Sequence, residues 1–99
     1  SLSAVPVFEE AYGFIDRGVV PAGTYANQAY LEPYVNYDPS LTNDQQVLLC
    51  DAQTSGGLLI AVTAHRAQQL MNELAQRGVA IAAIIGEIVA GPPGIDVAR

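Results

Sequence analysis

The 99-residue sequence contains no lysine and no tryptophan, and only four arginines stand against ten acidic residues. Its formal net charge is −6 at pH 7. Domains that bind nucleic acids usually carry a basic patch that neutralises phosphates, and this composition provides none. The absence of lysine also excludes any mechanism in which this chain supplies a catalytic lysine. We therefore expect no nucleic acid among its partners.

Cysteine and long apolar runs are equally scarce. Cys50 is the single cysteine, so no internal disulfide can form, and this fits the reducing cytoplasm, where we expect the protein. No apolar run reaches the roughly 18–20 residues that cross a bilayer, and Gly86 and Glu87 interrupt the longest one. The N-terminus lacks the basic and apolar regions of a secretory signal. We therefore expect no membrane partner.

The apolar content is sufficient for one small folded domain spanning residues 1–99. Hydrophobic residues make up 51% of the sequence, which favours folding over disorder. A chain of this length can build one modest core and is only marginally stable alone.

Four segments have the pattern of helices. Thr42 and Gln45 have the spacing of a capping box, which predicts that a helix follows Thr42. The clearest amphipathic pattern comes after Thr63, which is expected to cap that helix, and it ends at Gly78; its apolar positions are Ala67, Leu70, Met71 and Leu74. The helix after Thr42 is expected to span about Asn43–Leu49, and the other two predicted helices are Val7–Arg17 and about Thr24–Leu31 with Thr24 as cap.

Three segments are predicted to be strands. Leu58–Val62 is an unbroken apolar run, typical of a strand buried on both faces, and the strand is expected to begin at Gly57. Ala80–Ala90 is apolar with β-branched residues, and Ile95–Ala98 follows a Gly-Pro-Pro-Gly turn. Strand, helix and strand over Leu58–Ala90 predict a right-handed βαβ crossover or its split form. The expected fold class is α+β, with helices packed on a mixed sheet.

The irregular stretch Val19–Leu41 holds four of the five tyrosines, and two interpretations remain open for them. The rings can form a contact surface for a partner domain, or they can fill a small core of their own, since aromatic side chains bury large areas wherever they pack. The four are Tyr25, Tyr30, Tyr34 and Tyr37.

A polar loop, Thr54-Ser55-Gly56-Gly57, stands directly before the predicted strand. Glycines allow positive φ and close approach, and successive backbone N–H groups in such a turn can hold an anion without a basic side chain. Two hydroxyl donors add to this capacity. The competing interpretation is a tight turn whose hydroxyls bond to the local backbone.

Neither Cys50 nor His65 has the surroundings of a catalytic group. Cys50 follows two leucines at a predicted helix end and lacks the neighbours that lower a thiol pKa, so a buried structural role is expected. His65 has no second histidine or suitably spaced carboxylate, so we expect a solvated helix residue and no metal site.

Three motifs resemble the selenophosphate synthetase (selenide, water dikinase) family. Asp51–Leu59 is similar to that family's Asp-Pro-Gln-Thr-Ser-Gly-Gly-Leu-Leu run, with Ala52 in place of proline. Gly18–Thr24 with Asn27 is similar to its Pro-Gly-Gly-Thr-x-x-Asn motif, with Ala22 in place of one glycine. The third is Ile84–Ile88, and all three occur in the family's order.

The resemblance implies the C-terminal domain of a longer enzyme, aminoimidazole-ribonucleotide-synthetase-like in fold and truncated at its start. Such a parent converts selenide, ATP and water to selenophosphate, AMP and phosphate. Its Mg²⁺, its nucleophile and its lysine would belong to the missing N-terminal ATP-binding domain. That domain and a second copy of the chain are the expected partners. This chain alone is expected to hold no cofactor and to be inactive; the alternative function is a non-catalytic interaction or dimerisation module.

Candidate ligand-binding or interdomain residues are the loop Thr54, Ser55, Gly56 and Gly57, together with Thr24, Asn27 and Asp51. Thr24 and Asn27 either face the active-site cleft or serve as an N-cap and a turn amide. Asp51 could orient the loop or meet a magnesium ion through water; the alternative is a helix-end or turn residue that bonds its own backbone. No catalytic residue is assigned to this chain.

Overall fold

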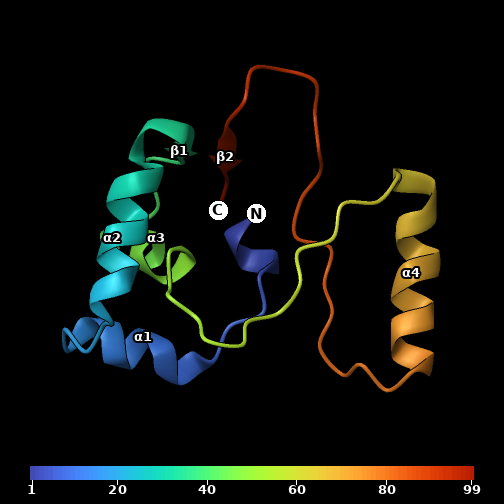
Figure 1. The fold of residues 1–99 in the computed structure, drawn as a ribbon, viewed down its shortest axis with the longest axis horizontal. Helices are drawn as coiled ribbons and strands as arrows, with labels where there is room; N and C mark the ends of the chain where they lie inside the picture. The colour runs from blue at the N-terminus through green and yellow to red at the C-terminus, as the bar shows by residue number, and fades with distance from the viewer.

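The computed structural model describes residues 1–99 and divides into two parts (Figure 1). The body comprises residues 1–52 and 95–99, and the arm comprises residues 53–94. Three helices and a small sheet make up the body, whereas the arm extends to one side and carries a single helix. The two chain termini lie close together near the middle of the molecule. None of the helices has the length and apolar character needed to span a membrane.

The body contains the helices α1 (Glu9–Asp16), α2 (Ala22–Leu31) and α3 (Asn43–Leu49). The predicted capping box before α3 is confirmed, because Thr42 Oγ1 accepts from Gln45 N and Gln45 Oε1 accepts from Thr42 N. Helix α1 is shorter than predicted at both ends, and Gly18 follows it with a φ of 69°. All three helices were predicted from local pattern.

The prediction that Thr24 caps α2 is wrong. The helix begins at Ala22 after Pro21, so Thr24 is its third residue and its side chain is free to bond elsewhere. Two short 3₁₀ helices, Leu2–Ala4 and Glu32–Tyr34, complete the helical structure of the body.

The sheet has two parallel strands, β1 (Val35–Tyr37) and β2 (Ile95–Val97). Asn36 Nδ2 donates to Asp96 Oδ1 at 2.9 Å across the pair. The N-terminus is fastened beside β2, since Leu2 N donates to Ala98 O at 2.8 Å. The final strand was predicted as Ile95–Ala98, but its partner lies in a stretch that the sequence analysis left irregular.

The core is small. Leu2, Leu41, Val47 and Cys50 are the buried hydrophobic residues, and Val47 is the most enclosed at 1% exposure. They come from the N-terminal 3₁₀ helix, the turn before α3, α3 itself and its C-cap residue Cys50. Cys50 is therefore a buried residue, as expected.

The arm consists of α4 (Ala64–Gln76) and two extended segments that connect it to the body (Figure 1). Thr63 occupies the N-cap position of α4, but its side chain makes no capping hydrogen bond. Gly78 ends the helix with a φ of 80°, and Val79 N donates to Leu74 O. The predicted helix is confirmed, and its bounds lie within the predicted ones.

The predicted strands Gly57–Val62 and Ala80–Ala90 are absent, and with them the βαβ unit. A strand needs a neighbouring backbone to bond, and these apolar segments have none in the chain. The α+β class holds at the level of helices plus a sheet, but the sheet is a two-stranded parallel pair rather than a mixed sheet covered by helices.

The tyrosines do not form a core of their own. Tyr25, Tyr30 and Tyr34 are exposed, and the rings of Tyr30 and Tyr34 lie 6.2 Å apart in a tilted arrangement. Only Tyr37 of the four is half-buried. The core interpretation is therefore wrong for three of the four rings.

Candidate functional site

A buried threonine joins two of the motif segments. Thr24, in the first turn of α2, is 1% exposed. Its hydroxyl donates to Asp51 Oδ1 at 3.3 Å and accepts from Ala52 N at 3.1 Å. One side chain thus satisfies a carboxylate oxygen and a backbone N–H immediately after α3. Asp51 accepts from Thr24 rather than from its own backbone, so the turn-residue interpretation of its side chain does not hold in this conformation.

Two further features hold the same junction together. Asn27, one turn after Thr24 on α2, donates from Nδ2 to Cys50 O at 3.1 Å. A Cβ on Gly23 would lie 3.1 Å from the Ala52 Cβ, so the glycine allows the two segments to approach closely. Ala52 stands where the resembling family run has a proline, and a proline would lack the N–H that bonds Thr24. The arm therefore leaves the body from a fixed point.

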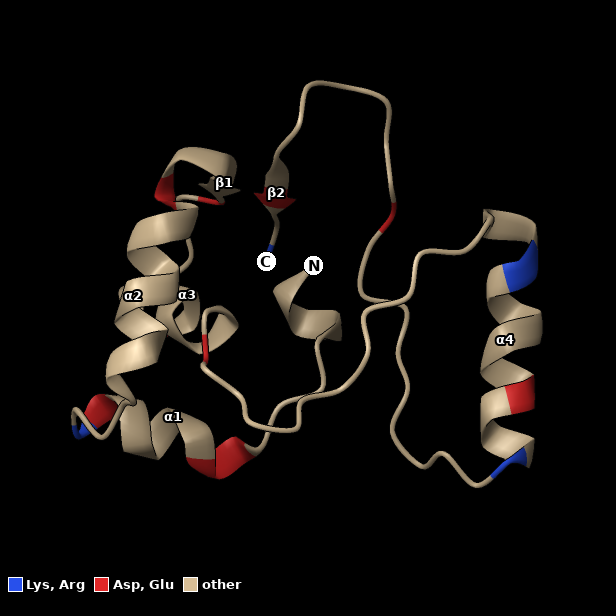
Figure 2. Ribbon diagram, viewed as in Figure 1, with Lys and Arg blue, Asp and Glu red and all other residues tan.

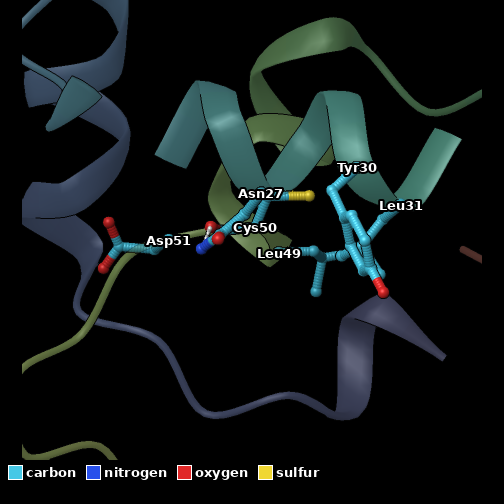
Figure 3. Close-up of a pocket in the computed structure, with 6 residues that line it drawn as sticks. All are labelled: Asn27, Tyr30, Leu31, Leu49, Cys50 and Asp51. Atoms are coloured by element: carbon cyan, nitrogen blue, oxygen red, sulfur yellow. Dashed lines mark hydrogen bonds between the residues drawn. The ribbon is translucent and has the colours of Figure 1, made fainter. Parts of the chain in front are cut away.

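A shallow hollow lies beside this junction (Figure 3). Tyr30 and Leu31 lie at one end and Asp51 at the other, with Asn27 and Cys50 between them. Its volume of about 220 Å³ is below the roughly 300–1,000 Å³ of pockets that enclose small molecules. The hollow alone cannot enclose a nucleotide.

Tyr37 and Cys50 form a polar contact next to the core, with Tyr37 Oη 3.6 Å from Cys50 Sγ. Burial is the main reason that the pKa of Tyr37 rises from 10.0 to about 12, and the hydrogen bond and charge interaction with Cys50 add to it. The phenol is therefore neutral over the physiological range. This contact holds β1 against the end of α3.

The loop Thr54–Gly57 lies in the arm, just beyond the junction, and all four residues are exposed. The hydroxyls of Thr54 and Ser55 make no hydrogen bond. The bonds from hydroxyl to local backbone that were predicted for a tight turn are therefore absent. An anion-binding nest requires a right-handed helical residue followed by a left-handed one, and neither Gly56 nor Gly57 has positive φ. The loop therefore does not form such a nest in this conformation. A Cβ on Gly56 would lie 2.6 Å from Gln53 Oε1. The loop offers unpaired donors on the surface.

The candidate residues thus fall into two groups. Thr24, Asn27 and Asp51 meet at the junction, while Thr54, Ser55, Gly56 and Gly57 lie outside it and contact none of them through hydrogen bonds. No three His, Cys, Asp or Glu residues lie close enough to hold a metal ion. Ala52 and Gly23 were not singled out as site residues, although they lie within the two resembling motifs Asp51–Leu59 and Gly18–Thr24.

The chain matches a protein-family model over most of its length. The model for the C-terminal domain of AIR synthase related proteins matches residues 2–97. Among curated proteins, the chain is 43% identical over 96 residues to a selenide, water dikinase of Myxococcus xanthus, covering 97% of this chain and 27% of that protein. It is 41% identical over 85 residues to a selenide, water dikinase of Aliarcobacter butzleri, covering 86% and 25%.

These figures also define the extent of the match. A third selenide, water dikinase, from Pelobacter propionicus, is 40% identical over 88 residues, with 89% of this chain and 25% of that protein covered. The chain spans about a quarter of the length of the curated relatives that it matches. Because the family model covers nearly every residue, the chain belongs to the AIR synthase related family, within its C-terminal domain.

Proposed function

We propose that this chain is part of the C-terminal domain of an ATP-dependent selenophosphate synthetase. The complete enzyme would convert selenide, ATP and water to selenophosphate, AMP and phosphate. The main support is similarity of about 40% along nearly the whole chain to proteins named selenide, water dikinase. The cytoplasm is the compartment that we propose for it.

The junction gives this proposal a structural basis. Two of the resembling motifs are far apart in sequence, yet Thr24 of the first bonds Asp51 and Ala52 of the second. A hydroxyl that is 1% exposed and bonded twice fixes the start of the Thr54–Gly57 loop relative to α2. In our proposal, Thr24, Asn27 and Asp51 position the loop and do not touch the substrate.

The loop itself is the segment that we assign to ligand contact. Its hydroxyls and backbone N–H groups are exposed and bonded to nothing in this chain. Donors of this kind can bind phosphate oxygens when another domain closes over them. We propose that the loop faces the cleft between this domain and the ATP-binding domain.

We propose that this chain alone does not hold the cofactors of the reaction. It has no cluster of three metal-binding side chains, no lysine, and no hollow large enough for ATP. We propose that Mg²⁺ and ATP are held by the ATP-binding domain of the complete enzyme, and that the isolated chain does not turn over ATP in response to selenide.

The test is to exchange domains with a relative. This chain would replace the matching 96 residues of the Myxococcus xanthus protein, and AMP release would be measured with and without selenide. Selenide-dependent release by the hybrid, and none by the isolated chain, is expected. A hybrid that folds and binds ATP but releases no AMP with selenide would contradict the proposal.

A second candidate function is an interaction module without a catalytic contribution. The observation that favours it is the exposed apolar arm, with Leu58 at 89% and Ile88 at 88% exposure. Calorimetry of the isolated chain with Mg²⁺–ATP separates the candidates further. Nucleotide binding would indicate a residual site, whereas a stable dimer without nucleotide binding would favour the module.

A further inference from the structure

The carboxylate of Asp51 is only partly used within the chain. Its Oδ1 accepts from the buried Thr24 hydroxyl at 3.3 Å, and no hydrogen bond reaches Oδ2. An ionised carboxylate can accept about four hydrogen bonds, so Asp51 keeps most of its capacity. Asp51 is also exposed, so a group from outside the chain can reach it. The residue therefore presents an acceptor charge that Thr24 holds in place.

No cation of this chain reaches Asp51. Arg17 lies 5.0 Å from the centre of the Phe14 ring and donates to Gly13 O, so its guanidinium is held at the end of α1. Two more arginines belong to α4, at the far side of the molecule from the body (Figure 2). The fourth is the last residue of the sequence, and its charge acts on Asp38. Asp51 is thus a fixed negative charge without a partner of opposite sign in this chain.

The hollow beside Asp51 has the lining for an extended side chain (Figure 3). Leu31 and Leu49 contribute apolar surface to it. Tyr30 stands at the end opposite Asp51 and is 73% exposed. Asn27 lies between the two ends, and because its Nδ2 donates to a backbone carbonyl, its Oδ1 remains a free acceptor. The hollow thus offers apolar surface along its length and acceptors toward Asp51.

Arginine is the residue that matches this combination of groups. Its long stem can lie along apolar surface while the guanidinium stays at a polar group. The guanidinium is a planar fork of N–H donors, which can bind the Asp51 carboxylate bidentately and still reach Asn27 Oδ1. Lysine has a compact, strongly hydrated ammonium that does not bind a carboxylate in this two-point manner. A metal ion is not favoured, since no three His, Cys, Asp or Glu residues lie close together.

The hollow is shallow, and this favours an arginine carried by a partner over a free small molecule. Its volume of about 220 Å³ does not enclose a ligand. A side chain attached to a partner needs no enclosure, because the surrounding interface holds it in place. The chain spans about a quarter of the length of its selenide, water dikinase relatives, so the rest of such an enzyme can supply the arginine. The net charge of −6 on this chain attracts a basic surface.

We propose that Asp51 and this hollow form the receptor for one arginine side chain of the ATP-binding domain. The guanidinium binds Asp51 and Asn27 Oδ1. Its stem lies over Leu49 toward Tyr30. The Thr54–Gly57 loop begins three residues after Asp51, so the contact places that loop at the boundary between the two domains. The identity of the partner rests on the proposed function, whereas the arginine receptor rests on the hollow and its charge.

A short arginine derivative tests the receptor on this chain alone. N-acetylarginine methylamide is titrated into the isotope-labelled chain, and NMR follows the Asn27 side-chain amide and the Asp51 and Ala52 backbone amides. A saturable change confined to these and neighbouring signals is expected. The citrulline derivative is the matched probe, because a neutral urea replaces the guanidinium at the same length, and it should cause no such change. No change with arginine, equal effects of the two probes, or changes spread over the whole acidic body would overturn the proposal.

Two variants that each remove one negative charge locate the binding. Asp51→Asn keeps an oxygen for the Thr24 hydroxyl, so the chain should fold with an unchanged circular dichroism spectrum. Its affinity for the arginine derivative should fall about tenfold or more, as expected when a hydrogen-bonded charge is lost. Glu32→Gln is the control, since Glu32 is exposed next to Leu31 but does not line the hollow, and the affinity should change by less than about twofold. Equal losses would assign the binding to net charge, and the proposal would be wrong.

Charge exchange in the hybrid enzyme tests the partner. Asp51→Arg should separate the two domains by repulsion, which small-angle X-ray scattering detects as a larger radius of gyration, whereas Glu32→Arg should leave the hybrid compact. Each exposed arginine of the ATP-binding domain is then changed to aspartate in the Asp51→Arg hybrid, and one of these changes should restore the compact form. If none does, the arginine does not come from that domain and the proposal fails.

The receptor and the proposed function can fail separately. A hybrid that makes selenophosphate, although this chain binds no arginine derivative, would overturn the receptor and leave the proposed function standing. Binding of the derivative together with a folded but inactive hybrid would uphold the receptor and contradict the proposed function.

Discussion

Thr24 and Asp51 lie in different motif segments, and the hydroxyl of Thr24 donates to Asp51 Oδ1 at 3.3 Å while accepting from the neighbouring Ala52 N. This buried hydroxyl connects the first turn of α2 with the end of α3 and sets the point at which the arm departs. The proposed position of the Thr54–Gly57 loop depends on this connection.

Replacing Thr24 with valine tests the connection. Thr24→Val keeps the shape but removes the hydroxyl, leaving the Ala52 N–H without a partner, so the free energy of unfolding should fall by about 1–3 kcal/mol. Urea unfolding measures this change. The control is Thr63→Val, since the Thr63 hydroxyl makes no capping bond and its loss should change stability by less than about 0.5 kcal/mol. Equal losses for the two variants would mean that the hydroxyl of Thr24 has no special role.

The capping box before α3 should contribute measurably to the stability of the body. Thr42→Ala removes the acceptor for Gln45 N, and α3 carries the most enclosed core residue, Val47. A loss of about 0.5–2 kcal/mol is expected in urea unfolding. Thr42→Ser retains the hydroxyl and should recover most of that loss; if serine is no better than alanine, the capping bond is not the cause.

The raised pKa of Tyr37 predicts a loss of stability at high pH. In the unfolded chain the phenol ionises near 10.0, and in the folded chain near 12, so between these values the folded state binds more protons. Stability from this group is complete below pH 10 and declines as pH rises toward 12. Tyr37→Phe should remove this decline in unfolding experiments and the late-ionising step in an ultraviolet titration. A wild-type titration with no step near pH 12 would contradict the assignment.

The loop hydroxyls should matter for ligand binding and not for folding. In the hybrid enzyme described above, Thr54→Val with Ser55→Ala should leave the melting temperature unchanged, because neither hydroxyl is bonded in this chain. ATP affinity or turnover should fall by about 10–100-fold, as expected when hydrogen bonds to a charged group are lost. Full retention of melting temperature, ATP affinity and turnover would reduce the loop to a simple connection.

Local features of the sequence predicted the helices well. The Thr42–Gln45 capping box and Gly78 are signals that act within one turn; α3 begins where the capping box predicts, and α4 ends just before Gly78. The burial of Cys50 also followed from its apolar neighbours.

Strand pairing depends on distant residues, and the sequence analysis failed there. Leu58–Val62 and Ala80–Ala90 have the composition of buried strands, but composition does not supply the backbone with which a strand must bond. Conversely, β1 lies in a stretch rich in proline and tyrosine, and its partner β2 is near the other end of the chain. The contact between Thr24 and Asp51 was missed for the same reason, although both residues had been singled out.

The most direct test of the proposed function is product analysis of the hybrid enzyme by phosphorus NMR. With selenide, ATP and Mg²⁺, the account predicts selenophosphate, AMP and phosphate in equal amounts, and none of the three from the isolated chain. If a folded hybrid that binds ATP yields no selenophosphate, the assignment of this chain to selenophosphate synthesis is wrong.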